Sequence, residues 1–206
     1  MKNLRLIFFV FAYVMLALSL LSCSKKATLP PLKADATILA FGDSLTFGTG
    51  APTESSYPAI LKTLVGRNVV SIGVPGEVSR DGLARLPAAL EEVRPQLLIL
   101  CHGGNDFLRK QPEAEVAANV RAMVKFAKDN NIDVLLIGTP KPGFGISVPD
   151  FYLGIAKEFS IPIEAEILTD ILTDNRLKSD LIHPNAAGYK KLAERIAELM
   201  KKAGAV

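Results

Sequence analysis

The sequence predicts an α/β domain in which a parallel sheet is covered by helices on both faces. From residue 37 onward, short apolar runs alternate with segments of helical periodicity, which is typical of repeated strand–helix–strand units. The composition, 49% hydrophobic and 22% charged over 206 residues, is that of an ordinary globular protein and favours one domain. The sequence shows no internal repeat and no boundary of a second domain.

Five short apolar segments are the expected strands. They are Thr37–Phe41, Asn68–Ile72, Gln96–Cys101, Asp133–Ile137 and a weaker Ile161–Ile163. Nearly continuous apolar runs of this length are typical of strands that are buried on both faces of a parallel sheet.

Three longer segments carry apolar residues at steps of three and four, which predicts amphipathic helices. These stripes are Leu83, Leu86, Leu90 and Val93, then Val116, Val120 and Met123, and finally Tyr189, Leu192, Ile196 and Leu199. We interpret them as faces that pack on the core. The Pro- and Gly-rich stretch Thr139–Gly145 is expected to be a loop after the fourth strand.

The N-terminal segment has the features of a secretory signal. Lys2 and Arg5 precede an apolar run, Leu6–Leu21, which is short for a membrane span. The following Leu20-Leu21-Ser22-Cys23 resembles the lipobox of bacterial lipoproteins, in which the cysteine is lipidated and becomes the new N-terminus. An uncleaved anchor helix and ordinary cleavage that leaves a free thiol are the alternatives.

The expected organisation is therefore a signal peptide over residues 1–22, a lipidated tether over 23–36 and a folded domain over 37–206. This predicts a protein of the bacterial cell envelope, held to a membrane through Cys23. Pro30 and Pro31 favour an extended tether.

Charge and composition argue against several classes of partner. The formal net charge is +3, and removal of residues 1–22, which hold Lys2 and Arg5 and no acid, leaves a nearly neutral chain. No basic stripe with interleaved aromatic residues is present, so nucleic acid is not an expected partner. Two cysteines cannot make a disulfide framework, and two histidines leave little room for a metal site.

Candidate catalytic residues lie near the carboxyl ends of the expected strands, where open α/β sheets bind their ligands. Ser44 follows the first strand, and a serine there is also a common helix N-cap. Asp180 lies three residues before His183, so its carboxylate can reach one imidazole nitrogen and leave the other for a serine. A histidine on the surface, or one satisfied in the core, is the alternative for His183.

Gly76 and Asn105 follow the second and third strands and are candidate hydrogen-bond donors. A glycine lets a backbone N–H approach a ligand closely, and a carboxamide offers two donors. Such donors stabilise the negative charge that develops during acyl transfer. The alternatives are an ordinary turn glycine and an asparagine that closes a loop.

Four sequence blocks, taken together, resemble the GDSL or SGNH hydrolase family. They are Gly42-Asp43-Ser44-Leu45, Gly76, Gly103-Gly104-Asn105-Asp106 and Asp180-Leu181-Ile182-His183-Pro184. Residues 76–87 and 98–106 are most similar to the arylesterase and acyl-CoA thioesterase I/lysophospholipase L1-like branch. The resemblance implies a flavodoxin-like fold with five parallel strands in the order 2-1-3-4-5. Thr46 replaces the second glycine of a Gly-x-Ser-x-Gly elbow, which argues against the ordinary α/β-hydrolase fold.

The resemblance also implies roles for individual residues. Ser44 would be the nucleophile, Asp180 and His183 the base pair, and the Ser44 amide with Gly76 and Asn105 the oxyanion hole. Asp43 and Asp106 are expected to shape loops. No cofactor or metal is implied.

The implied substrates are small-molecule esters or lipids, first aryl and short-to-medium acyl esters and then acyl thioesters or lysophospholipids. A deacetylase of envelope polysaccharide is an alternative within the enzymes. An inactive, lipid-anchored binding lipoprotein is the alternative from another class.

Several further residues carry expectations about the pocket and the third strand. Phe107 and Leu108, together with Phe144, Ile146, Val148 and Phe151, could line an acyl pocket or simply pack. Cys101 is expected to be buried and His102 to lie at the rim of the site, since neighbouring side chains on a strand point to opposite faces.

Overall fold

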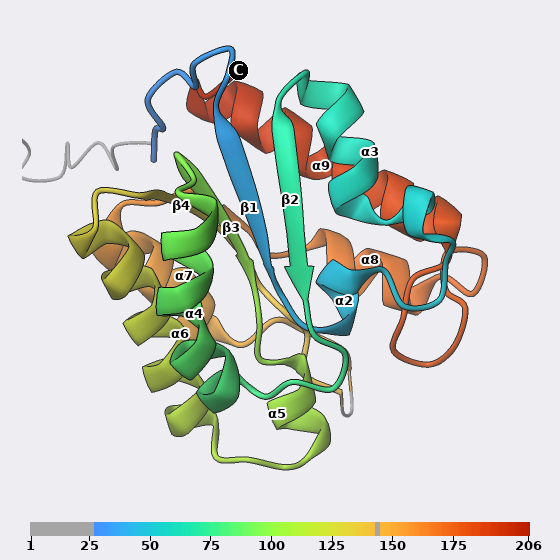
Figure 1. Cartoon of the computed structure of the whole chain (residues 1–206). Coiled ribbons are helices and arrows are strands. Elements are labelled where there is room, and N and C mark those ends of the chain that lie inside the picture. Colours follow the sequence, from blue (N-terminus) through green and yellow to red (C-terminus); the bar gives the residue numbers. More distant parts are fainter. Residues whose placement is uncertain (1–26, 143–144) are drawn as a thin grey trace, which may run out of the picture.

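A five-stranded, all-parallel sheet forms the centre of the molecule (Figure 1). The computed structural model describes residues 27–142 and 145–206, so the expected signal peptide and Cys23 lie outside the described residues. The strands are β1 (Thr37–Gly42), β2 (Asn68–Gly73), β3 (Leu97–Cys101), β4 (Asp133–Ile137) and β5 (Ile163–Glu164). Their order is β2-β1-β3-β4-β5, which confirms the predicted topology.

The strand predictions are confirmed to within one residue for the first four strands. The fifth strand was placed too early, because β5 begins only at Ile163. Ile161 belongs instead to the turn that follows a helix, and its backbone N–H donates to the Ala156 carbonyl. β5 pairs over two residues at the sheet edge, so its sequence carries little strand signal.

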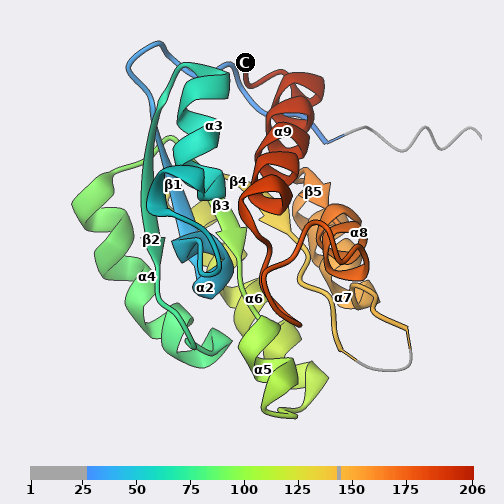
Figure 2. The same cartoon turned by 90° about the vertical axis from the view of Figure 1, so that its right-hand side faces the viewer.

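Helices cover both faces of the sheet, as expected. The helices α3 (Tyr57–Val65), α8 (Ile167–Thr173) and α9 (Ala186–Ala203) pack on one face. The opposite face is covered by α4 (Ser79–Val93), α6 (Glu113–Asp129) and α7 (Asp150–Phe159). Figures 1 and 2 show the two layers from perpendicular directions.

The three predicted stripes all face the core. Those of α4 and α6 belong to one apolar cluster and that of α9 belongs to the other. Sequence reasoning did not identify α3, α7 or α8, which have no more than ten residues each and so offer few helical turns in which a pattern can show. Three one-turn helices complete the described chain, namely α2 (Ser44–Phe47), the 3₁₀ helix η1 (Thr53–Ser55) and α5 (Gly104–Leu108).

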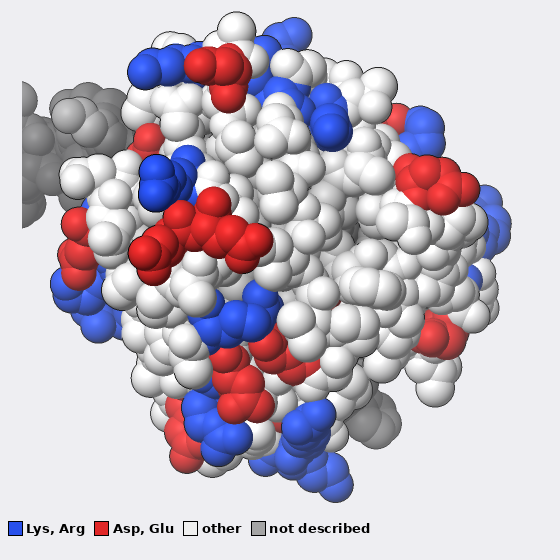
Figure 3. All heavy atoms as spheres, viewed as in Figure 1, with Lys and Arg blue, Asp and Glu red and all other residues white. Residues whose placement is uncertain are grey.

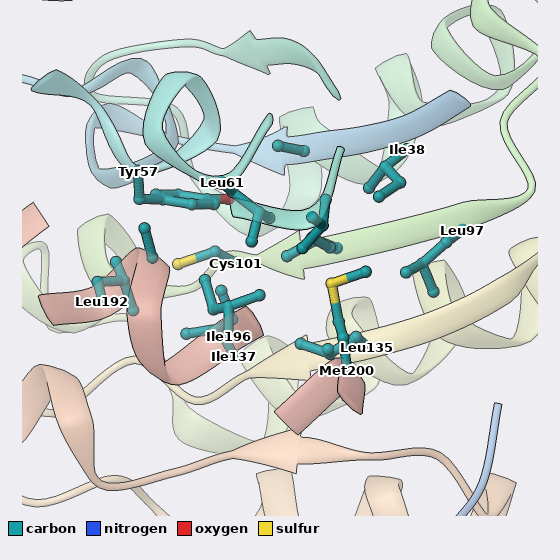
Figure 4. Packing of buried hydrophobic residues seen from close by; sticks show 14 of the residues in the cluster. Ile38, Tyr57, Leu61, Leu97, Cys101, Leu135, Ile137, Leu192, Ile196 and Met200 are labelled. Carbon is teal, nitrogen blue, oxygen red and sulfur yellow. The ribbon is translucent and has the colours of Figure 1, made fainter. Parts of the chain in front are cut away.

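The core between the sheet and α3 and α9 is close-packed (Figure 4). Ile38, Leu97 and Leu135 contribute from β1, β3 and β4, while Ile196 and Met200 reach them from α9, and all five side chains are fully buried. Burial of one such side chain contributes about 2 kcal/mol to the free energy of folding. This layer holds the strands rigidly, and hence the loops at their carboxyl ends.

The segment before β1, where the sequence predicts an extended tether, is packed on the domain from Leu29 onward. Leu29 and Leu32 are buried against the first cluster. Their backbone N–H groups donate to the carbonyls of Ala203 and Ala205 at the chain's C-terminal end. Residues 29–36 are thus part of the folded unit, because these two leucines bury apolar surface that a free tether would expose to water.

Charges of both signs are interspersed over the face shown in Figure 3. Among residues 27–142 and 145–206, no helix combines the length and apolar character that crossing a membrane requires.

Candidate active site

The predicted site residues follow the strands at the carboxyl edge of the sheet, the lower edge in Figure 1, where α2 and α5 lie. Ser44 follows β1, Gly76 follows β2 and Asn105 follows β3. The loop before α9 brings Asp180 and His183 to the same edge. Adjacent parallel strands end at a common edge, so residues far apart in the sequence meet there.

Ser44 is the first residue of α2 and is held by its neighbours on either side. A Cβ on Gly42 would lie 2.1 Å from the Cys101 carbonyl oxygen, so only glycine allows β1 and β3 to come this close. Asp43 caps α2, because its Oδ1 accepts a hydrogen bond of 3.0 Å from the Leu45 amide. Burial raises the pKa of Asp43, an effect that the hydrogen bond from the Leu45 amide partly opposes. Asp43 is therefore the cap, which leaves the Ser44 hydroxyl free of that role.

The pair Asp180 and His183 has the geometry that the sequence spacing predicts. Asp180 Oδ2 lies 2.8 Å from His183 Nδ1, and Oδ1 accepts hydrogen bonds from the backbone N–H groups of Ile182 and His183. Partial burial alone would raise the pKa of Asp180, but these hydrogen bonds lower it below its usual value. The carboxylate is consequently ionised at neutral pH, and its hydrogen bond to Nδ1 holds the imidazole in place.

His183 connects this carboxylate to Ser44. Its Nε2 lies 3.0 Å from Ser44 Oγ, although the two residues are 139 positions apart in the sequence. Since Nδ1 donates to an ionised carboxylate, Nε2 of the neutral ring carries no proton and accepts one from the serine hydroxyl. The three side chains form one continuous chain of hydrogen bonds that can transfer a proton from Ser44 to His183.

Pro184 lies just before the last helix, because α9 begins at Ala186. Asn185 is the N-cap, and its Oδ1 accepts from the Gly188 amide. Pro184 therefore lies one residue before the cap, and it forms an isolated antiparallel bridge with Lys178.

Asn105 lies beside Ser44, but its amide hydrogens already have acceptors. Nδ2 is 3.1 Å from Asp43 Oδ2 and 3.0 Å from the Glu77 carbonyl oxygen. An oxyanion at this place would share or replace one of these two bonds. These contacts also connect the loops that follow β1, β2 and β3.

Gly76 is exposed in the loop after β2, with a φ of 79°. This backbone conformation strains any residue with a Cβ, although a Cβ added here would meet no atom closer than 3.9 Å. The Gly76 carbonyl accepts a hydrogen bond of 2.8 Å from Arg109. Within the part of the chain that the structure describes, neither the Gly76 amide nor the Ser44 amide donates to a protein acceptor.

A small apolar hollow of about 60 Å³ opens beside Ser44, Asn105 and His183. Leu108 and Ile146 line it, as expected, together with Pro140, Leu181 and other residues. Phe107 instead belongs to the apolar cluster between the sheet and α4, α6 and α7, and Val148 and Phe151 pack against that cluster. Phe144 lies outside the described residues.

His102 is not at the rim of the site, and this expectation was wrong. The side chain is fully buried, and both ring nitrogens have partners, the Gly103 amide on Nδ1 and the Glu77 carboxylate on Nε2. The strand ends at Cys101, so the chain turns and directs the imidazole inward. Cys101 is buried as predicted, and burial raises the pKa of its thiol.

Sequence reasoning assigned no function to Glu77, Arg85 or Arg109, all of which contact the loops that carry the site. The sequence around a charged residue does not indicate which loop its side chain will contact in the folded chain. No group of three or more potential metal ligands occurs among residues 27–142 and 145–206.

The flavodoxin-like sheet, with the hydrogen-bonded Ser44, His183 and Asp180 at its carboxyl edge, places the chain in the class of SGNH-type α/β hydrolases. The model of the GDSL-like Lipase/Acylhydrolase family matches residues 40–191. The chain belongs to this family and is a hydrolase of the GDSL type.

Relatives with assigned names agree with this class. The chain is 29% identical over 173 residues to thioesterase 1/protease 1/lysophospholipase L1 of Escherichia coli K12, which covers 80% of this chain and 83% of the relative. It is 28% identical over 200 residues to an arylesterase of Vibrio mimicus, which covers 91% and 98% of the two chains.

Solved structures agree as well. The crystal structure of TesA superimposes with a TM-score of 0.73 at 28% identity, covering 81% of this chain and 99% of that one. AlinE4, described as an SGNH-hydrolase family esterase, superimposes with a TM-score of 0.63 at 28% identity and covers 82% and 96% of the two chains.

Proposed function

We propose that the protein is a serine esterase that cleaves carboxylic esters through an acyl-serine intermediate. The observation that carries the proposal is the uninterrupted chain of hydrogen bonds from Ser44 Oγ through His183 to Asp180. A serine hydroxyl is a weak nucleophile unless a base takes its proton during the attack. His183 is placed to do this, and Asp180 stabilises the imidazolium that forms.

The reaction proceeds in two acyl transfers. Ser44 Oγ attacks the ester carbonyl carbon while its proton moves to His183 Nε2, and the amides of Ser44 and Gly76 with the Asn105 side chain stabilise the oxyanion. The tetrahedral species collapses, the proton passes from His183 to the leaving alcohol oxygen, and the acyl-serine remains. Water then attacks the acyl carbon with His183 as base, which releases the acid and restores the Ser44 hydroxyl.

The size and lining of the hollow favour short acyl groups. Its volume of about 60 Å³ is small beside the roughly 300–1,000 Å³ of ligand pockets that enclose whole drug-sized molecules. Its apolar lining, which includes Leu108, Ile146 and Leu181, suits a hydrocarbon chain. The names of the relatives, arylesterase and thioesterase 1/protease 1/lysophospholipase L1, support aryl and short-to-medium acyl esters as substrates, followed by thioesters and lysophospholipids.

We also propose that Cys23 carries lipid and holds the protein to a membrane of the bacterial envelope. The Leu20-Leu21-Ser22-Cys23 sequence supports this proposal. The described chain joins the domain at Leu29 beside Ala203, just before β1 begins, and the site lies beyond the carboxyl end of β1. The site would therefore face away from the point of attachment.

The decisive experiment for the activity labels the purified protein with a fluorophosphonate probe, which requires an activated serine. We expect stoichiometric labelling of Ser44, no labelling of Ser44→Ala, and hydrolysis of p-nitrophenyl acetate and butyrate faster than of the laurate. Absence of labelling in the intact protein would support an inactive binding protein. Release of acetate from acetylated polysaccharide, without turnover of aryl esters, would favour a polysaccharide deacetylase.

The anchoring is tested separately, by expressing the full chain and Cys23→Ser in a bacterial host. We expect the protein in the membrane fraction with a diacylglyceryl-modified Cys23 seen by mass spectrometry, and the variant either in the soluble fraction or unprocessed. Mature protein that begins at an unmodified Cys23 would contradict lipidation.

A further inference from the structure

A second buried cluster of charged and titratable side chains lies next to the site, and the reaction above makes no use of it. Its members are Glu77 in the loop after β2, Arg85 on α4 and His102 after β3. The Glu77 carboxylate receives hydrogen bonds from Arg85 Nε at 2.8 Å and Nη2 at 2.6 Å. Its Oε2 also lies 3.1 Å from His102 Nε2. The exposed fractions of the Glu77 and His102 side chains are only 8% and 0%.

The protonation pattern of this cluster follows from its hydrogen bonds. His102 Nδ1 accepts from the Gly103 amide at 3.1 Å, so the ring is the neutral tautomer with its proton on Nε2, which it donates to Glu77. Burial alone would raise the pKa of Glu77, but the hydrogen bonds from Arg85 and His102 lower it to about 2. Glu77 is thus an ionised carboxylate with three donors fixed around it.

The surrounding structure is shaped to hold the cluster in one position. A Cβ on Gly82 of α4 would lie 2.2 Å from His102 Nε2, so a glycine there provides the space for the ring. The His102 carbonyl accepts a hydrogen bond of 2.7 Å from the Tyr152 hydroxyl. The Arg85 guanidinium lies 4.1 Å from the centroid of the Phe41 ring. The Glu77 side chain thus joins α4 to the loops that follow β2 and β3.

The backbone of Glu77 connects this cluster to the reacting groups. Its carbonyl oxygen accepts a hydrogen bond of 3.0 Å from Asn105 Nδ2, and its peptide nitrogen is bonded to Gly76, whose amide donates to no acceptor among the described residues. Two of the three oxyanion donors in the proposed reaction are therefore placed by the same residue. A displacement of about 1 Å in such a donor is enough to cost on the order of 10²-fold in rate.

We infer that Glu77, locked by Arg85 and His102, is a positioning residue that aims the Gly76 amide and the Asn105 carboxamide at the oxyanion. The inference rests on the proposed esterase function and adds residues to it. Glu77 is hydrogen-bonded to Arg85, His102 and Asn105 and not to Ser44, so its effect is expected in the step in which the oxyanion develops. Its loss should therefore lower kcat and leave KM nearly unchanged.

Glu77→Gln tests the inference, with Glu164→Gln as a matched control. Glu164 is also a nearly buried glutamate, 6% exposed, that accepts a hydrogen bond of 2.7 Å from Arg195 Nε, but it lies on β5 at the other edge of the sheet. Both variants remove one buried charge opposite an arginine. We expect Glu77→Gln to lower kcat about tenfold or more with KM within twofold, and Glu164→Gln to keep kcat within about twofold.

A double-mutant cycle separates positioning from general destabilisation. In an Asn105→Ala background, Glu77→Gln should cost less than about threefold in kcat, because one donor that it positions is already gone. Rates are expressed per fluorophosphonate-reactive Ser44, so that unfolded protein does not count. Arg85→Lys keeps the positive charge but loses the bidentate hydrogen bond to the Glu77 carboxylate. This variant provides the same test if Glu77→Gln does not fold.

The outcomes distinguish this inference from the proposed function. An inactive, unlabelled wild type would overturn the esterase proposal and, with it, this inference. An active wild type in which Glu77→Gln, or Arg85→Lys in its place, matches Glu164→Gln would overturn the positioning role alone. Losses that multiply fully in the Asn105→Ala background would also overturn it, because independent effects combine in that way.

Discussion

The two histidines of this chain are each paired with a carboxylate, yet their surroundings differ in almost every other respect. His183 is 15% exposed and its partner Asp180 is 52% exposed, and Nε2 points at the Ser44 hydroxyl. His102 is fully buried, and both of its ring nitrogens are bonded within the protein. A histidine acts as a base only if one nitrogen is unprotonated and faces a reacting group. The same pair of residue types is thus suited to proton transfer at one place and to positioning at the other.

The largest effect on activity is expected from the loss of the His183 side chain. His183→Ala should lower kcat by at least about 10³-fold while the fold remains intact, since the side chain carries the proton from Ser44. The double variant with Ser44→Ala should be no slower than either single variant, because both residues act in one proton transfer. Steady-state kinetics with circular dichroism as a fold control measures this. A double variant far slower than either single one would show that the two residues act separately.

The next largest effect is expected at Asn105. Its carboxamide lies beside the catalytic candidate Ser44 and donates to the carbonyl of Glu77, the partner of His102. Asn105→Ala should lower kcat by about 10²–10³-fold with little change in KM, because the carboxamide bonds most strongly to the oxyanion of the transition state. Asn105→Asp should be at least as damaging, since a carboxylate repels that charge. If Asn105→Ala kept more than about half of kcat, the side chain would be a loop-closing residue only.

The pH dependence of activity should follow the partly exposed pair of His183 and Asp180. Asp180, whose pKa is lowered, is ionised throughout the range above pH 5, so only protonation of His183 switches the base off. We expect kcat/KM to rise with pH and then to level off, because the His183 ring accepts the Ser44 proton only when Nε2 is unprotonated. A flat profile from pH 5 to 9 would contradict the role of His183.

The pH dependence of stability should instead follow the buried pair of His102 and Glu77. The pKa of Glu77 falls from 4.5 to about 2 on folding, so its ionised form stabilises the native state above about pH 4.5, and this contribution is lost as the pH drops towards 2. Between pH 5 and pH 2.5, wild type should lose about 2 kcal/mol more free energy of unfolding than Glu77→Gln. Urea unfolding at both pH values measures the difference. Equal acid sensitivity of the two proteins would mean that Glu77 is not held as described.

The smallest effect on activity is expected at the opposite end of the sheet. Leu29→Ala should lower the free energy of unfolding by about 2 kcal/mol and leave kcat unchanged, because Leu29 packs beside Ala203, far from either histidine. The matched exposed position Leu153, on α7, should give a much smaller loss on substitution by alanine. An unchanged stability of Leu29→Ala would mean that this segment does not contribute to the folded unit.

Local sequence patterns predicted the elements whose signal is periodic and long. The stripe from Leu83 to Val93 lies on α4, and the apolar run Asp133–Ile137 is β4 at both bounds. The spacing of Asp180 and His183 likewise predicted their contact, because it lies within one turn of chain. The patterns failed at β5, whose two paired residues, Ile163 and Glu164, are too few to show an alternation.

The sequence by itself determined the fold class and predicted Ser44, Asp180 and His183 as the candidate reacting side chains, because strand periodicity, helix periodicity and the four short motifs are local properties of the chain. Only the tertiary structure decided which residues surround them. Arg85 and His102 lie 8 and 25 positions after Glu77 in the sequence. The three side chains meet because β1, β2 and β3 are neighbours in the sheet and end at one edge. The burial of His102, and hence its difference from His183, follows from that meeting and from the space left by Gly82.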